Sequence, residues 1–593
     1  MDSEKVEKLL HEIKKDIYVD QELKKQLKET FVKKKKMKFQ RRSLVSTLVA
    51  AAVFFAVFFN YFQIKQTNAS AFNIQNAISF LDVGSGEITS YTYHGEILYV
   101  SIKNQGIFSY TSSGYKKITE ETADSLSHSQ HTNSLLFSQN GGIFIFNLDT
   151  KKKEEIVSGG YSQPVWKNDE NIYAEKLMEN KTIIVEINTD SKEEKVISIG
   201  QHPSFNEKEY KLVFERDGEI MIRNKTGKEI VVDKGKDPNI SKGGSYISYV
   251  QESDGFENVW ISDFNLKTKK KVTSNPPSRE NPKVGLYKYH SSVWSSDERT
   301  LYVLKKDEIQ ANSRIMMISL SESEVTSKDT VIRYLQALLV RDDDYAKGMM
   351  ENPPEFLTYS NPSQIGYKII NVLDSEDRAT VTAEVYWTYT ATPYYKISTY
   401  EFELYKANNR FVIKGVTEKE TKEIFDLDTG RIQLLKNGQI AEDYFSLEDI
   451  PKSMLNSENI RISSLVLAQS GNEIIFSLQE MNEKKPSNVS ILKYNIKAKI
   501  FSLVGKISSE QGQDIVIEKM SIDSTGGFVS ADVFDGEISR VVVADINKGE
   551  SAGQFNKTHT IFWQGNSLLI EENNEYFTTL YKYDPEKSIK NNF

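Results

Sequence analysis

Histidines are the first candidates for a functional site, because two of them are close together in the sequence. His128 and His131 are three residues apart in a polar stretch, and imidazoles at this spacing can reach one metal ion. No third ligand stands beside them, so a solvated loop is favoured over a metal centre. We therefore predict no metal site in this chain.

The sequence also lacks the common catalytic patterns. It contains no cysteine, which excludes disulfides, thiolate nucleophiles and cysteine-ligated zinc or iron–sulfur centres. The G-x-S-x-G elbow, the Walker A loop and the G-x-G-x-x-G loop are absent, and the Asp/Asn turns do not have EF-hand spacing. We expect no catalytic residue, no cofactor and no enzymatic activity.

A basic cluster followed by an apolar stretch organises the chain. Residues 43–62 carry no charge, and as a helix they are about 30 Å long, the thickness of a bilayer core. We predict a transmembrane helix over 43–64, with residues 1–42 in the cytoplasm, because basic residues stay on that side. The cluster expected to contact the membrane surface is Lys33, Lys34, Lys35, Lys36, Lys38, Arg41 and Arg42.

A cleaved signal peptide is the alternative to this anchor. Ala69-Ser70-Ala71 has the form of a cleavage site, and signal peptides pair such a site with an apolar segment. The basic region of 42 residues is longer than the usual leader, and the apolar run is long enough to span. An uncleaved anchor is favoured, and cleavage stays open.

Charge is distributed unevenly along the chain. The 593 residues carry 75 basic and 83 acidic side chains, a net charge of −8. Residues 1–42 hold 14 basic against 8 acidic residues, or +6, so residues 43–593 hold 61 against 75, or −14. An acidic main part does not suit nucleic acid, and the asymmetry fits a basic cytoplasmic face with an acidic exterior.

Residues 1–42 have the apolar spacing of two short amphipathic helices. The apolar positions, which could contact a cytoplasmic partner, are Leu9, Leu10, Ile13, Ile17, Leu23 and Leu27. This arrangement of a small helical segment, one span and a large exterior part resembles membrane-anchored anti-sigma factors, and the resemblance implies a sigma factor as partner. The zinc-binding His/Cys motif of better-known anti-sigma domains is missing, and a solvated anchor is the alternative.

The exterior part contains a repeated unit of short β-rich runs separated by turns. The first apolar run of each unit centres on an equivalent residue, and the first five of these are 37, 37, 40 and 35 residues apart. A period near 40 with several strands per unit is typical of a β-propeller. The equivalent residues are Leu98, Leu135, Ile172, Leu212, Ile247, Leu301, Ile474, Phe528 and Leu568.

These units resemble the TolB-type propeller repeat, which reads roughly P-x-W-S-P-D-G before a strand. Trp294-Ser295-Ser296-Asp297 matches it best, and Gln163-Pro164-Val165-Trp166 and His202-Pro203-Ser204-Phe205 match in part. We therefore expect a mainly β protein with one propeller of seven to nine blades, built from residues 72–325 and 426–593. The resemblance implies binding of proteins, peptides or glycans. Trp166, Trp260, Trp294 and Trp563 are expected to pack between blades.

A different pattern interrupts the repeats at 326–425. Helical spacing predicts a helix over 328–340 and a short one over 344–350, and alternation predicts strands, the clearest over 379–389. This order resembles the small α+β cone of the nuclear-transport-factor-two, cystatin and ketosteroid-isomerase-like folds. Asp342, Asp343 and Asp344 lie between the helices, where we expect them to cap the second helix or face solvent.

Together these features predict a single-pass protein of the bacterial cell membrane with its amino terminus in the cytoplasm. We expect a non-catalytic extracytoplasmic module that binds or senses an envelope ligand, either a protein or a glycan. Residues 1–42 would signal to a cytoplasmic protein such as a sigma factor. The alternative is a surface scaffold or envelope-assembly protein without a signalling role.

Overall fold

A computed structural model describes residues 73–592, except 84–85, 112–113, 130, 254, 276–277, 279–283, 308–311, 322–324, 408–409, 427–429, 456, 469, 482–485, 510–514 and 537. The predicted cytoplasmic helices in 1–42, the predicted span 43–64 and the cleavage site Ala69-Ser70-Ala71 lie outside the described residues. So do all the basic and apolar side chains predicted to contact the membrane or a cytoplasmic partner. Among the helices that are described, none has the length and apolar character needed to traverse a bilayer.

Residues 88–271 form five consecutive antiparallel sheets of four strands each. The first two contain β2 (Ile88–His94), β3 (Ile97–Ile102), β4 (Gly106–Thr111), β5 (Gly114–Thr119), β6 (Ser125–His128), β7 (Ser134–Gln139), β8 (Gly142–Asn147) and β9 (Lys153–Val157). The next two contain β10 (Tyr161–Trp166), β11 (Asn171–Met178), β12 (Lys181–Asn188), β13 (Glu194–Ile199), β14 (Gln201–Asn206), β15 (Lys211–Arg216), β16 (Glu219–Arg223) and β17 (Glu229–Lys234). The fifth contains β18 (Lys236–Ile240), β19 (Tyr246–Ser253), β20 (Phe256–Asp263) and β21 (Lys270–Lys271).

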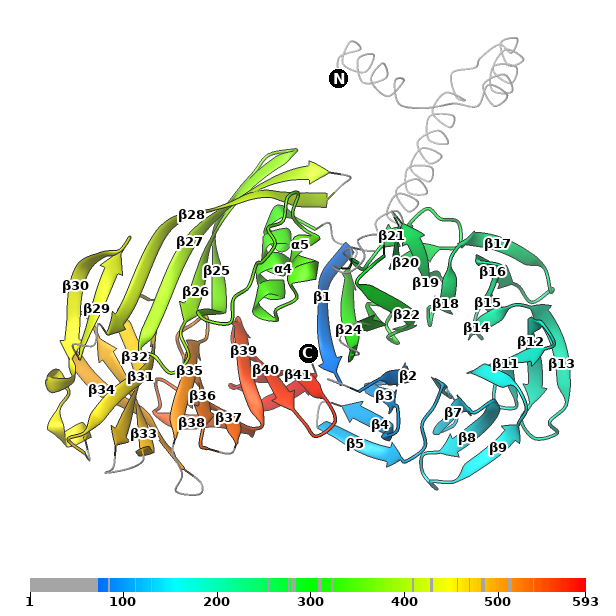
Figure 1. The fold of residues 1–593 in the computed structure, drawn as a ribbon, viewed down its shortest axis with the longest axis horizontal. Coiled ribbons are helices and arrows are strands. Elements are labelled where there is room, and N and C mark those ends of the chain that lie inside the picture. The colour runs from blue at the N-terminus through cyan, green and yellow to red at the C-terminus, as the bar shows by residue number, and fades with distance from the viewer. Residues whose placement is uncertain are drawn as a thin grey trace, which may run out of the picture. The chain divides into compact units, whose positions relative to one another are not determined.

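A sixth four-stranded unit is assembled from two distant parts of the chain. β22 (Tyr287–Trp294), β23 (Thr300–Asp307) and β24 (Asn312–Ser321) are joined by β1 (Asn73–Asp82), which pairs antiparallel with β24. The first strands of the six units contact one another in order, from β2 through β6, β10, β14 and β18 to β22, and β22 contacts β2. These sheets therefore surround a common centre, as Figure 1 shows, in an arrangement consistent with a β-propeller.

The equivalent apolar residues predicted from the repeat have equivalent places in the structure. Leu98, Leu135, Ile172, Leu212, Ile247 and Leu301 are each the second residue of the second strand in their sheet. All six are buried, with at most 3% of the residue exposed. Trp294, predicted to pack between blades, is 1% exposed, and its indole N–H donates to the Asn239 carbonyl in the neighbouring sheet. The equivalence of these positions is thus confirmed, but they lie on the second strand of each sheet, whereas the repeat predicted the first strand.

The inner strands carry a further repeated feature, a bulge beside a proline. Gln163, His202 and Asp237 each precede a proline and have a left-handed backbone, with φ of 46°, 52° and 50°. The pairing register shifts at each of these points. Proline cannot donate to a strand ladder and is confined to edges and bulges, so the repeated X-Pro pair fixes the bulge and turns the preceding side chain toward the centre.

The two predicted helices are confirmed. α4 (Ser327–Leu339) begins at the N-cap Thr326, which forms a capping box with Asp329, and α5 (Asp343–Lys347) begins at the N-cap Asp342. The predicted apolar face of α4 is buried, because it packs on the strands that follow. Asp342 accepts from the Tyr345 amide, so the expectation that the acidic triplet caps this helix is confirmed for its first member.

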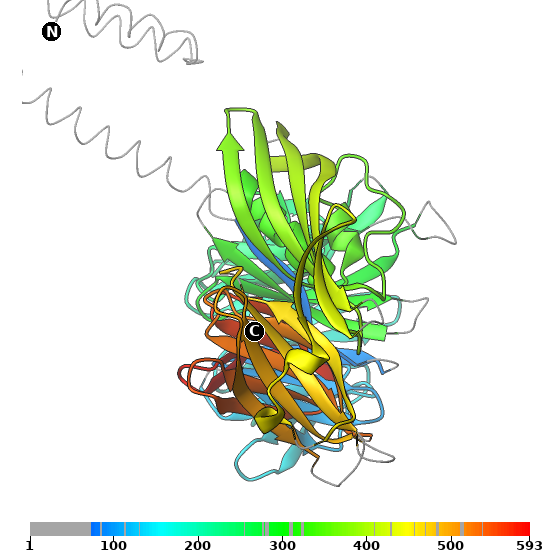
Figure 2. The ribbon, with the colours of Figure 1, turned by 90° about the vertical axis from the view of Figure 1, so that its left-hand side faces the viewer.

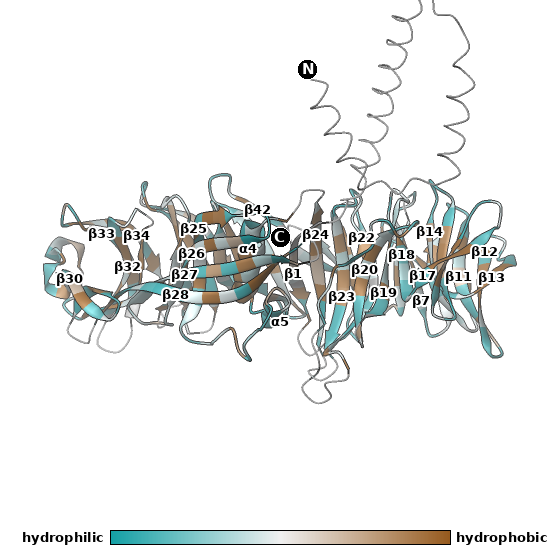
Figure 3. Cartoon of the chain, turned by 90° about the horizontal axis from the view of Figure 1, so that it is seen from above, coloured by the Kyte–Doolittle hydropathy of each residue, from teal (hydrophilic) through white to brown (hydrophobic). Residues whose placement is uncertain are grey.

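A six-stranded antiparallel sheet follows the helices. It contains β25 (Ser363–Asp374), β26 (Arg378–Thr388), β27 (Tyr394–Ala407), β28 (Arg410–Asp426), β29 (Arg431–Lys436) and β30 (Gln439–Ser446) in this order. Buried and partly buried residues alternate along β26 as predicted, and Figure 3 shows hydrophobic and hydrophilic residues alternating on these long strands. The sheet continues beyond residue 425, the predicted end of the α+β part.

Two short 3-10 helices, η2 (Leu447–Asp449) and η3 (Lys452–Met454), lead to three C-terminal strand groups. The strands are β31 (Ile460–Leu467), β32 (Glu473–Met481), β33 (Pro486–Asn495), β34 (Ile500–Ser508), β35 (Val516–Ile522), β36 (Phe528–Phe534), β37 (Ser539–Asp545), β38 (Glu550–Asn556), β39 (Thr558–Gln564), β40 (Ser567–Asn573), β41 (Thr578–Asp584) and β42 (Ile589–Asn592). β27 contacts β31 and β25 contacts β39, and Figure 2 shows these orange and red strands beside the green and yellow sheet.

The expectation of one ring with seven to nine blades is corrected by this topology. The ring has six sheets, all from residues 73–321, and the three C-terminal groups pack on the six-stranded sheet instead. The C-terminal strands stay outside the ring because of the pairing of β1. One edge of β1 pairs with β24 of the ring, and the other edge pairs with β41 through Leu81–Thr579 and Asp82–Thr578. Strand β41 therefore joins the ring edge to edge through β1, without becoming a blade of it.

Candidate functional site

A polar cavity of about 630 Å³ lies where the described parts of the chain meet. Its walls come from β1 and β24 of the ring, the end of α4, the start of β25, and the C-terminal strands β35, β36 and β39–β41. The volume falls in the usual range for small-ligand sites, about 300–1,000 Å³. Most of these sites are apolar, whereas this cavity is lined by charged and hydroxyl side chains.

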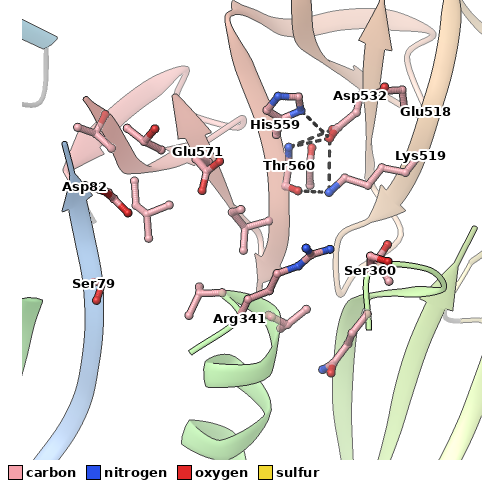
Figure 4. A pocket seen from close by; sticks show the side chains of 18 of the residues that line it. Ser79, Asp82, Arg341, Ser360, Glu518, Lys519, Asp532, His559, Thr560 and Glu571 are labelled. Carbon is pink, nitrogen blue, oxygen red and sulfur yellow. Dashed lines mark hydrogen bonds and ion pairs between the residues drawn. The ribbon is translucent and has the colours of Figure 1, made fainter. Parts of the chain in front are cut away.

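One wall is built around the buried carboxylate of Asp532 on β36, which is 2% exposed. Both of its oxygens accept from the Thr560 amide, at 3.0 Å each. The Lys519 Nζ lies 3.5 Å from Oδ2 and also donates to the Thr560 carbonyl, and His559 Nδ1 lies 3.9 Å from Oδ2. Figure 4 shows this network at the side of the cavity. A buried carboxylate needs such partners, so this wall is rigid.

The opposite side presents Arg341, which follows α4 in a left-handed backbone conformation with φ 57°. Its guanidinium projects into the cavity from the end of the helix (Figure 4). Among the described residues no hydrogen bond or ion pair engages this guanidinium. An arginine held in a polar cavity without a carboxylate partner is available to a ligand, because its planar fork binds carboxylate or phosphate in two places.

Glu571 on β40 and Glu518 on β35 are two acidic residues of the lining without an ion-pair partner among the described residues. Burial is the main influence on the Glu571 carboxyl group and raises its pKa. His559, Lys519 and Arg341 act in the opposite direction, and Asp82 adds to the rise. Burial thus disfavours the charged form of this carboxyl group relative to that of an exposed glutamate.

The residues that line the cavity include three with buried hydroxyl groups, Ser79, Thr560 and Thr579. Buried polar atoms are nearly always satisfied by protein, water or ligand. The Thr579 hydroxyl is a hydrogen-bond partner of Tyr110 and Tyr581, whereas those of Ser79 and Thr560 have no partner among the described residues.

The lining brings positive, negative and hydroxyl groups together. Arg341 and Lys519 supply positive charge, serine and threonine residues supply hydroxyl groups, and Glu571 supplies a carboxyl group. These groups can orient a polar, anionic ligand.

The histidines singled out in the sequence do not form a joint site. His128 is buried and stacks on His94 with ring centroids 4.0 Å apart. His131 is partly exposed, and its Nε2 lies 2.8 Å from a Glu207 carboxylate oxygen. The two imidazoles thus have separate partners. The prediction of a solvated loop is correct for His131 and wrong for His128, which the adjacent strand buries.

Sequence reasoning missed the residues of the cavity, because they come from strands far apart in the chain. Asp82, Arg341, Lys519, Asp532 and Glu571 converge only through the pairing of β1 with β41 and the contact of β36 with β39. One signal was present. Asp532 interrupts the apolar strand Phe528–Phe534, and a charge within such a run indicates a buried polar site.

Comparison with known proteins gives no family for this chain. No family model matches it, and no curated protein matches it. The resemblances to the nuclear-transport-factor-two fold and to anti-sigma factors therefore stay predictions.

Solved structures with a related arrangement include a putative TolB from Agrobacterium tumefaciens, 12% identical over 36% of this chain and 89% of that one, with a TM-score of 0.29. The tricorn protease is 10% identical over 86% of this chain and 58% of its own, with a TM-score of 0.31. The extracellular domain of a putative one-component system from B. thetaiotaomicron is 9% identical over 88% of this chain and 78% of that one, with a TM-score of 0.28. Likenesses this low carry no argument about activity.

Proposed function

We propose that this chain is a non-catalytic binding or sensing module, and that its ligand enters the cavity with an anionic group directed at Arg341. The observation that carries the proposal is the guanidinium of Arg341, which projects into a polar cavity without a partner among the described residues. The Arg341 side chain is exposed to solvent and has no ion pair among the described residues. A ligand carboxylate can therefore reach the guanidinium and form one.

The lining narrows the class of ligand. Large apolar side chains are few in this cavity, so a lipid or steroid has little to contact, whereas hydroxyl and charged groups line most of it. Such a surface suits an acidic sugar or the free carboxyl end of a short peptide. Both belong to the protein or glycan ligands expected of an extracytoplasmic module.

Ligand binding is tested with full-length protein and paired probes. Short peptides with a free C-terminal carboxylate are compared with the same peptides amidated, and uronic-acid oligosaccharides with their methyl esters. Binding is followed by the shift of the thermal unfolding midpoint. We expect only free acids to stabilise the protein, and Arg341→Gln to weaken their binding at least about tenfold, since hydrogen bonds to charged groups contribute about 1.5–3 kcal/mol. Equal binding by acids and esters would contradict the proposal.

The cellular placement proposed here has residues 1–42 in the cytoplasm and the described sheets outside. It is supported by the uncharged stretch 43–62 and by the basic cluster before it. The test uses intact cells with an epitope tag at either end of the chain. External protease is expected to remove a C-terminal tag and to spare an N-terminal one, and the reverse pattern would overturn the orientation.

The proposed cytoplasmic partner is a sigma factor bound by the apolar positions of residues 1–42. Full-length tagged protein is crosslinked in cells and captured, beside a variant lacking residues 2–32. A sigma factor recovered with the full chain and lost from the variant supports signalling. If both forms recover the same proteins and behave alike in cells, the surface scaffold is the better description.

A further inference from the structure

Apart from the cavity, the ring contains a group of ionisable side chains that converge on one point. His202 lies on β14, Glu215 on β15, and Asp237 on β18 of the next sheet. One ligand atom from each lies within 4.8 Å of the others. β14 and β18 are in contact, and both lie on the side of their sheets that faces the middle of the ring (Figure 1). The group therefore joins two neighbouring sheets near the centre of the ring.

Two distances within this group fall in the range expected between ligands of one metal ion, and the third, between the two carboxylates, is within 4.8 Å. His202 Nδ1 lies 3.1 Å from Glu215 Oε2 and 3.2 Å from Asp237 Oδ1. Nitrogen and oxygen ligands lie about 2.0–2.2 Å from a zinc-like ion, so neighbouring ligands in tetrahedral or octahedral geometry are roughly 3.0–3.5 Å apart. A small ion can therefore sit among these three atoms with little movement.

The local charge favours a divalent cation. Glu175 and Glu215 are each 8% exposed, and Glu175 accepts from the His202 amide. Three acidic side chains, Glu175, Glu215 and Asp237, thus surround one imidazole. The nearest lysines have other partners, since Lys236 pairs with Glu257 at 2.6 Å and Lys306 with Glu87 at 3.1 Å. Carboxylates at this depth need compensating positive charge.

Neighbouring groups hold the three side chains in place. The Gln201 side-chain amide donates to Glu215 Oε1 at 2.9 Å, which leaves Oε2 directed at His202. The bulges beside Pro203 and Pro238 direct His202 and Asp237 inward. Metal ligands are commonly oriented by such outer hydrogen bonds. A cavity of about 180 Å³ borders His202 and Asp237 and leaves room for water as a further ligand.

We propose that His202, Glu215 and Asp237 bind one divalent transition-metal ion of the Zn²⁺ or Mn²⁺ class. One imidazole nitrogen with two carboxylates suits these ions, whereas Ca²⁺ and Mg²⁺ prefer oxygen alone. The ion links the sheet of β14–β17 to the sheet of β18–β21, so its role is to fasten two neighbouring sheets of the ring.

The test uses full-length protein treated with EDTA and then titrated with ZnCl₂ by calorimetry. We expect one ion per chain, and zinc X-ray absorption spectra that contain scattering from one imidazole. Asp237→Asn and, separately, Glu215→Gln are each expected to weaken binding at least about tenfold, which is the scale of ligand-shell effects. Circular dichroism shows whether each variant is folded. If one variant is unfolded, the zinc affinity of the other tests the proposal.

His131→Asn is the matched control, because His131 also lies beside two carboxylates, Glu207 at 2.8 Å and Asp169 at 3.7 Å, but at a more exposed position. It is expected to bind zinc like the wild type. Chelation is expected to lower the thermal unfolding midpoint of the wild type and of His131→Asn, and to leave Asp237→Asn unchanged. Absence of stoichiometric zinc in the wild type, or undiminished affinity in both folded ligand variants, would overturn the proposal.

Discussion

The amide of Thr560 donates to both carboxylate oxygens of Asp532, at 3.0 Å to each. Asp532 belongs to β36 and Thr560 to β39, so this contact joins the sheet of β35–β38 to the strands that reach the ring through β41. Lys519 binds both partners, through the Asp532 carboxylate and the Thr560 carbonyl. One buried carboxylate thus holds a cavity wall and a junction between sheets.

Replacing Asp532 with Asn should lower the free energy of unfolding by about 1–3 kcal/mol, because the partly buried Lys519 loses its counter-charge and the Thr560 amide loses a charged acceptor. The measurement is urea unfolding of full-length protein followed by tryptophan fluorescence. Glu154→Gln is the control, since the Glu154 side chain is 69% exposed and surface pairs contribute little. If the free energy of unfolding changes no more than in the control, the Asp532 network does not stabilise the fold.

We expect the free energy of unfolding to fall as the pH is lowered, because the buried His128 becomes protonated. Burial, followed by the neighbouring His94, lowers the pKa of His128 to about 4, whereas an unfolded histidine titrates near 6.5. The folded state binds fewer protons between these values, so the stabilisation is complete above about pH 6.5 and is lost toward pH 4. The loss is on the order of 3 kcal/mol, at about 1.4 kcal/mol for each pKa unit.

His128→Phe should flatten this part of the profile, measured as urea midpoints between pH 7 and pH 4. His131→Asn serves for comparison, because the hydrogen bond with Glu207 raises the pKa of His131. The contribution of His131 to stability therefore falls as the pH rises, which is the opposite of the trend for His128. An unchanged slope in His128→Phe would assign the acid sensitivity to other groups.

Glu571→Gln should stabilise the ligand-free protein at pH 7, because it removes a carboxylate whose charged form is disfavoured by burial. Burial raises the pKa of Glu571, so its contribution is favourable below the pKa of an unfolded glutamate and is lost as the pH rises through the folded pKa. The gain should therefore shrink toward pH 4. The same variant should bind anionic ligands more tightly, because one repulsive charge is gone. Weaker anion binding by this variant would place the ligand elsewhere.

Thr326→Ala should cost about 1 kcal/mol, the usual value of a helix N-cap. The Thr326 hydroxyl accepts from the Asp329 amide at 3.1 Å, and the Asp329 carboxylate accepts from the Thr326 amide at 3.0 Å. Thr326→Ser keeps the capping oxygen and should behave like the wild type in thermal unfolding. Equal loss in both variants would indicate that the methyl group, and not the cap, stabilises this end of α4.

Leu81→Pro should destabilise the contact between the ring and the C-terminal strands. Leu81 pairs with Ile315 on one side of β1 and with Thr579 on the other. Proline removes the backbone donor and does not fit a central strand. Limited proteolysis should cut the variant faster than Leu81→Val, which keeps the backbone. Equal resistance would show that this pairing does little to hold the two parts together.

The sequence by itself determined the local elements, because their signals lie within a few residues. Apolar periodicity predicted α4, alternation predicted β26, and the spacing of equivalent residues identified one buried strand in every repeated unit, although the repeat predicted the first strand and the structure shows the second. Leu98 and Ile474 illustrate this, since each is the second residue of its strand and each is buried. Local periodicity reports which face of an element is buried, and it does so without knowledge of the partner.

Only the tertiary structure decided which sheets share a ring and where polar groups meet. Ile474 has the same pattern as Leu98 but lies outside the ring, because strand pairing between β1, β24 and β41 depends on long-range contacts that leave no local signal. The same is true of Arg341 and Asp532 at the cavity, and of His202 and Asp237 in neighbouring sheets. Their chemistry depends on distances in space, which separation along the chain does not report.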